Sequence, residues 1–148
     1  MSDEDIYNYV KLREKLDIPI MATEFPAGGL ETYPIWLTER ATDYLRGDIP
    51  NKGGLTTMLK TAHLAEAFNV RVCPHFLMEL HVALCCAVPN ARWLEYIPQL
   101  DDITAERMRI DKGYAMPSAA PGLGIDWNFE AIERLTVDGS LRRMTKNG

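Results

Sequence analysis

The strongest constraint on this chain is a repeated alternation of two kinds of segment. Four times in succession, a segment with helical periodicity is followed by a short apolar segment typical of a strand, at intervals of about 25 residues. This alternation is typical of α/β proteins, in which each helix carries the chain from one parallel strand to the next. The sequence therefore predicts a parallel sheet covered by helices.

The boundaries of these segments follow from periodicity and from breakers such as proline and glycine. We expect helices over residues 3–16, 34–41, 53–68 and 77–88, and strands over residues 18–22, 44–47, 70–73 and 92–94. Because a complete eight-fold β/α barrel takes roughly 250 residues, a chain of 148 residues can form only part of one. We predict one partial barrel domain, with helix–strand units in residues 1–97 and, in residues 98–148, an extension with a hairpin and a final helix.

Charge and composition exclude several classes of partner. Sixteen Lys and Arg against 21 Asp and Glu give a net charge of −5, and like charges form no long block. We therefore expect neither a nucleic-acid partner nor a membrane partner. The apolar run at residues 80–89 is too short to span a bilayer, and the N-terminus lacks the pattern of a secretion signal. The three cysteines, Cys73, Cys85 and Cys86, are an odd number and include no Cys-x-x-Cys pair. This favours a protein with reduced thiols in the cytoplasm.

Each predicted strand ends in a residue that can ionise or bind a metal. These residues are Glu24, Asp48, His75 and Glu95. In α/β folds, functional sites are built at the carboxyl ends of parallel strands. A single carboxylate at such a position often only caps the next helix or faces solvent. Four in succession favour a site, because apolar strands otherwise have little use for an acid at their ends.

The order and spacing of these residues resemble a known family. Four short motifs follow one another: Glu24-Phe25, Asp48-x-x-x-x-Gly53-Gly54, Pro74-His75-Phe76 and Trp93-Leu94-Glu95. Together with residues 89–92 and 121–125, they resemble the C-terminal half of the barrel domain in the enolase superfamily, most closely its mandelate racemase subgroup. The resemblance covers about residues 3–135 and implies half of a TIM-type barrel.

The resemblance also implies a role for each strand-end residue. Glu24 resembles the last of three carboxylate ligands to Mg²⁺, a cation that prefers oxygen ligands. Asp48 and His75 resemble the family's dyad, in which the carboxylate fixes the imidazole tautomer and raises its basicity. Glu95 resembles the acid that donates a hydrogen bond to the substrate carboxylate. A proton alpha to a carboxylate is weakly acidic. The metal ion and the hydrogen-bond donors are therefore needed to stabilise the anion that forms when this proton leaves.

Other features favour structural interpretations. His63 and His81 are expected to be ordinary helix residues, and the cysteines are expected to be small core residues. Gly53 and Gly54 lack the pattern of a phosphate-binding loop, so a tight turn explains them.

Two functions from different classes remain open. The family's other metal ligands and second base belong to earlier strands, so we expect a fragment of a larger enzyme that is inactive alone. The first function is a racemase or dehydratase of 2-hydroxy acids or acid sugars. The second is a non-catalytic half-barrel that self-associates through exposed edges, and in either case we expect a homo-oligomer. A flavodoxin-like binding protein suits the length but leaves the four strand-end residues unexplained.

Overall fold

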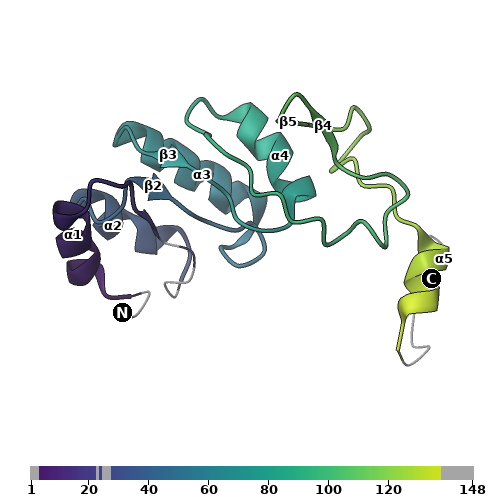
Figure 1. Ribbon diagram of the computed structural model, residues 1–148, viewed down its shortest axis with the longest axis horizontal. Helices are drawn as coiled ribbons and strands as arrows, with labels where there is room; N and C mark the ends of the chain where they lie inside the picture. Colours follow the sequence, from purple (N-terminus) through teal and green to yellow (C-terminus); the bar gives the residue numbers. More distant parts are fainter. Residues whose placement is uncertain (1–3, 23, 25–27, 138–148) are drawn as a thin grey trace.

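The protein is built around a small parallel sheet, as its computed structural model shows for residues 4–22, 24 and 28–137 (Figure 1). Three short strands form the sheet: β1 (Met21–Ala22), β2 (Tyr44–Leu45) and β3 (Arg71–Val72). They lie in chain order, with Met21 opposite Tyr44 and Tyr44 opposite Arg71. A parallel sheet whose neighbours follow chain order is the arrangement of successive units in a β/α barrel.

Helices alternate with these strands in the predicted order. They are α1 (Ile6–Lys15), α2 (Tyr33–Thr38) with a preceding 3-10 turn η1 (Leu30–Thr32), α3 (Gly54–Ala67) and α4 (Met78–Ala87). The side chain of Asp5 caps α1 by accepting a hydrogen bond from the backbone N–H of Asn8. The first helix therefore begins later than predicted, and the α/β class is confirmed.

The fourth predicted strand, over residues 92–94, is reduced to a single point of pairing. The structure describes this segment in full, and the one bridge to β3 there is parallel and joins Val72 to Ala91, the residue just before the predicted strand. The backbone N–H of Arg92 donates to the Val72 carbonyl at 3.1 Å. The next donor on the β3 side would be Pro74, which has no N–H. The ladder is interrupted at that point, and the residues predicted as a fourth strand form none, which corrects the prediction.

The core lies between the sheet and the helices that follow its strands. Its main cluster joins α2, α3, α4 and the strands, and consists of Tyr33, Leu37, Leu45, Ile49, Met58, Ala62, Ala65, Val72, Leu84 and Val88. A second cluster, Ile20, Ala22, Trp36 and Ala41, packs against α1. Burial of this apolar surface fixes the strand ends in place, and the functional candidates extend from those ends.

The C-terminal part of the described chain is an extension of the sheet domain. Strands β4 (Arg109–Asp111) and β5 (Tyr114–Met116) form an antiparallel hairpin. Lys112 and Gly113 both have positive φ, 49° and 85°, as a two-residue hairpin turn requires. Helix α5 (Phe129–Leu135) lies at the opposite end of the molecule from α1 (Figure 1). The division of the chain at residue 97 remains a prediction.

Membrane-spanning helices can be looked for over the whole described chain. None of its described helices combines the length and the apolar character that crossing a membrane requires.

Candidate functional site

The four strand-end residues predicted from the sequence lie together at one edge of the sheet. His75 is at the centre: its Nδ1 atom is 3.0 Å from a carboxylate oxygen of Glu24 and 3.5 Å from one of Asp48. Its Nε2 atom is 3.5 Å from a carboxylate oxygen of Glu95. One imidazole is thus surrounded by three carboxylates that come from different strand ends. The chemical role of each residue remains a prediction.

Backbone pairing between β2 and β3 sets the positions of Asp48 and His75. The N–H of His75 donates to the carbonyl of Gly47 at 2.9 Å, which extends the pairing past the last residues of β2 and β3. Asp48 is only 1% exposed. Its two carboxylate oxygens accept hydrogen bonds from the backbone and side-chain nitrogens of Asn51, both at 3.3 Å. Asn51 therefore holds the buried carboxylate, and the oxygen that accepts from the Asn51 side chain is also the one nearest to Nδ1 of His75.

Arg46 is a member of this site that the sequence reasoning missed. Its Nε atom lies 2.6 Å from a Glu24 oxygen, and its Nη2 atom lies 3.0 Å from both Glu95 oxygens. The signal was available, because side chains two residues apart on an extended segment point the same way, and Arg46 precedes Asp48 by two. The guanidinium brings two carboxylates together by charge-assisted hydrogen bonds.

The donor set can be tested against the metal that the resemblance implies. Glu24, the predicted ligand, already has one oxygen against His75 and the other against Arg46. Over residues 4–22, 24 and 28–137, no three His, Cys, Asp or Glu side chains are arranged to hold a metal ion. Mg²⁺ bound by proteins usually keeps several waters and one or two carboxylates in octahedral geometry. The described residues could contribute Glu24 as one carboxylate ligand of such an ion, and this role remains a prediction.

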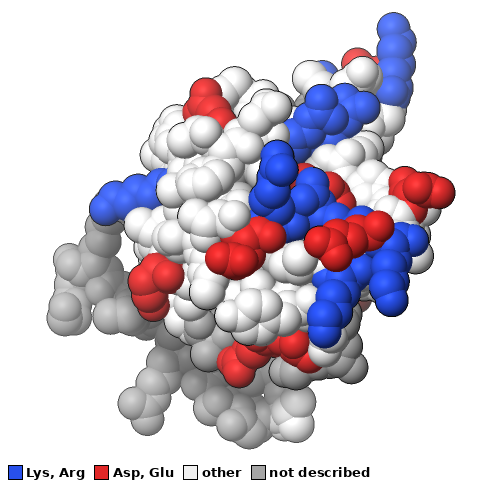
Figure 2. All heavy atoms as spheres, turned by 90° about the vertical axis from the view of Figure 1, so that its left-hand side faces the viewer, with Lys and Arg blue, Asp and Glu red and all other residues white. Residues whose placement is uncertain are grey.

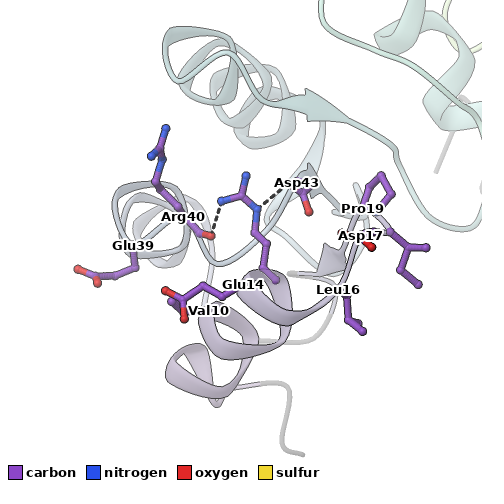
Figure 3. Close-up of a pocket in the computed structure, with 10 residues that line it drawn as sticks. Val10, Glu14, Leu16, Asp17, Pro19, Glu39, Arg40 and Asp43 are labelled. Atoms are coloured by element: carbon purple, nitrogen blue, oxygen red, sulfur yellow. Dashed lines mark hydrogen bonds and ion pairs between the residues drawn. The ribbon is translucent and has the colours of Figure 1, made fainter.

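A separate cavity of about 430 Å³ lies at the amino ends of β1 and β2, away from this site. Figure 2 views the α1 side of the molecule, where basic and acidic side chains alternate. In the close-up, Glu14, Glu39 and Arg40 surround the cavity, and Arg13 bonds to Asp43 at 2.6 Å across it (Figure 3). The Arg13–Asp43 pair is thus already satisfied within the cavity lining.

A family model and several known proteins match this chain. A family model described as enolase C-terminal domain-like matches residues 1–132. L-Talarate/galactarate dehydratase of Salmonella typhimurium is 32% identical over 127 residues, which cover 86% of this chain and 32% of that protein. Arabinonate dehydratase of Saccharolobus solfataricus is 30% identical over 125 residues, which cover 77% of this chain and 32% of that protein. The chain therefore spans about a third of the length of these relatives.

Solved structures match over nearly the whole chain. L-Talarate dehydratase from Polaromonas, complexed with Mg and L-glucarate, superposes with a TM-score of 0.80 at 33% identity and covers 89% of this chain and 37% of that one. An enolase from Bradyrhizobium, complexed with magnesium and mandelic acid, gives a TM-score of 0.83 at 26% identity. The match covers 90% of this chain and 37% of that one. Proteins similar to this chain thus bind magnesium together with small carboxylic acids.

Proposed function

Because the chain belongs to the enolase superfamily, matches its enolase C-terminal domain-like family and forms half of a TIM-type barrel, we propose that it supplies the acid–base part of a proton-abstraction site. The reaction removes the proton alpha to a carboxylate, and racemisation or loss of water from the β-carbon follows. The substrate is a small carboxylate, either an acid sugar or a 2-hydroxy acid. The dehydratases described above, which resemble this chain, favour the acid sugar.

The position of the His75 ring carries this proposal. Nδ1 faces the carboxylates of Glu24 and Asp48, so the neutral ring holds its proton at Nδ1 and leaves Nε2 as the base. Glu95 lies on the Nε2 side, where it can donate a hydrogen bond to the substrate carboxylate when protonated. A proton acceptor and a hydrogen-bond donor thus face the same space.

Glu24 is the residue of this chain that would hold magnesium. The bound ion would supply positive charge against the enediolate that forms when the α-proton leaves. One carboxylate is a small part of the ligand set that a tightly bound cation needs. We therefore propose that the chain alone binds Mg²⁺ weakly and turns over substrate negligibly.

The second candidate, a non-catalytic half-barrel that self-associates, is favoured by a different observation. A groove of about 860 Å³ lies between α4, residues 91–96 and the β4–β5 hairpin. Around it, Trp93, Tyr96 and Tyr114 are 50%, 57% and 74% exposed. Burying such aromatic surface stabilises an oligomer. We propose a homo-oligomer in either case, and a folded monomer throughout the micromolar range in light scattering would contradict it.

The remaining partner and location proposals rest on charge and cysteine chemistry. The net charge of −5 argues against a nucleic-acid or anionic-membrane partner. Cys73, Cys85 and Cys86 are all free thiols, which is consistent with a reducing compartment and a cytoplasmic location.

Exchange of the substrate α-proton with solvent deuterium tests the function directly. The chain is incubated in D₂O with Mg²⁺ and L-glucarate, alone and mixed with the separately produced N-terminal part of the Salmonella typhimurium dehydratase. We expect exchange, seen by proton NMR, only in the mixture and only while His75 is intact. His75→Asn is the test variant, and His63→Asn on the exposed face of α3 is its matched control.

The outcomes separate the two candidate functions. Exchange that survives His75→Asn contradicts the proposed base. Exchange in no mixture favours the self-associating half-barrel.

A further inference from the structure

His81 lies in α4 and is completely buried, although the sequence suggested an ordinary helix residue. Its Nε2 atom is 2.9 Å from the backbone nitrogen of Ile49, and its Nδ1 atom is 2.8 Å from the carbonyl of Phe76 and 3.1 Å from that of Leu77. A backbone N–H can only donate, so Nε2 is the acceptor and Nδ1 carries the proton. Burial lowers the pKa of His81, which keeps the ring neutral in this arrangement.

The hydrogen-bond partners of this ring sit next to the predicted dyad. Ile49 directly follows Asp48, and Phe76 directly follows His75. One side chain therefore ties together the two loops that carry the dyad, each at the residue after the functional one. His81 reaches Ile49 across 32 residues of sequence, so this contact is tertiary.

The loop after His75 has an unusual backbone that needs such support. Phe76 and Leu77 both have positive φ, 66° and 26°, a region that residues with a Cβ rarely occupy. Both of their carbonyls face Nδ1 of His81. The same turn aims the backbone N–H of Phe76 at a carboxylate oxygen of Glu95, 3.2 Å away. Strained backbone of this kind persists only where contacts with the surrounding structure hold it in place, and it is concentrated at functional sites.

We propose that His81 is a positioning residue, which clamps the loops after β2 and β3 and so sets the separation of Asp48 and His75. The catalytic consequence rests on the proposed function, whereas the clamp is a property of the fold. A leucine would fill the same space, but it would leave the Ile49 N–H and the Phe76 carbonyl without their buried partner, whereas the Leu77 carbonyl would keep the N–H of Leu80.

Three substitutions separate the two halves of the clamp. His81→Gln keeps an acceptor for Ile49, His81→Asn keeps a donor for the carbonyls, and His81→Leu keeps neither. Leu84→Ala is the matched control, because Leu84 is a buried residue of the same helix outside these hydrogen bonds. Two NMR readouts at one fixed pH are followed: hydrogen exchange of the Ile49 amide and the ring signals of His75.

We expect the Ile49 amide to exchange about five- to tenfold faster in His81→Asn and His81→Leu than in His81→Gln, because one net hydrogen bond is lost. The His75 ring signals should shift in all three variants and stay in place in Leu84→Ala. Where substrate exchange is measurable, the His81 variants should lower kcat and leave KM within about twofold.

The clamp is overturned if Leu84→Ala moves the His75 signals as far as the His81 variants do. It is also overturned if His81→Gln and His81→Asn leave both readouts unchanged, a result that stands even if His81→Leu does not fold. Neither NMR readout needs turnover, so failure of the clamp and failure of the proposed function are seen separately.

Discussion

Replacing Gly47 with alanine tests how closely the site is packed against the core. Gly47 directly precedes Asp48, and its carbonyl accepts the hydrogen bond from the His75 N–H. A Cβ added there would lie 2.7 Å from Cε of Met58 and 3.0 Å from the hydroxyl oxygen of Tyr33. Both of these side chains are 0% exposed, so neither can swing into solvent to make room.

The expected loss of stability follows from two opposing effects. Overpacking a core typically costs about 1–3 kcal/mol. Replacing glycine by alanine in a compatible backbone stabilises by about 0.4–1 kcal/mol, because the unfolded chain loses freedom. We therefore expect Gly47→Ala to lower the free energy of unfolding by about 1–2 kcal/mol, and Tm by about 2–8 °C for a chain of this size.

Denaturant unfolding followed by tryptophan fluorescence measures this loss, since Trp36 is buried in the core. Met58→Ala provides the double-mutant partner. Alone it should cost about 2–5 kcal/mol by leaving a cavity, but it also removes the clash with an added Cβ. The double variant should be more stable than the sum of the single effects by about 1 kcal/mol or more. Strict additivity, or a Gly47→Ala protein as stable as the original, would refute the packing argument.

Three further predictions concern other parts of the chain. Asp43→Ala should cost about 1–3 kcal/mol in urea unfolding, because Arg13 and the N–H of Ile20 lose the acceptors they have at 2.6 and 2.8 Å; a change below about 0.5 kcal/mol would contradict this. Burial raises the pKa of Cys85 to about 12, so at pH 8 iodoacetamide should alkylate the exposed Cys86 first, and equal rates by mass spectrometry would count against it. Magnesium near its dissociation constant should raise Tm by only about 1–2 °C in a thermal scan, and a shift several times larger at millimolar Mg²⁺ would show a more complete site.

Features that depend on local sequence patterns could be predicted from the sequence. The alternation of helices and strands follows from periodicity, and the grouping of Glu24, Asp48, His75 and Glu95 follows from their places at successive strand ends. The fourth strand could not be judged in the same way. Whether Pro74 interrupts its ladder depends on which residue of β3 faces it, and that register is a property of the folded sheet.

Roles that depend on distant partners were missed for a related reason. Arg46 contacts Glu95 across 49 residues of sequence, and His81 contacts Ile49 across 32. Neither side chain belongs to a short motif, and an arginine or a helical histidine has many ordinary uses. The two-residue spacing to Asp48 places Arg46 on the side of the site, but the carboxylate partners of Arg46 and the contacts of His81 are set by tertiary packing.

The proposed function depends on the Nδ1 atom of His75, which faces the carboxylates of Glu24 and Asp48 and carries the proton of the neutral ring. A long-range proton–nitrogen NMR spectrum of the ¹⁵N-labelled protein reports the tautomer of this ring directly. We predict that neutral His75 is protonated at Nδ1, and that its Nδ1 signal moves in both Asp48→Asn and Glu24→Gln. A ring protonated at Nε2, or an Nδ1 signal that responds to neither substitution, would contradict it.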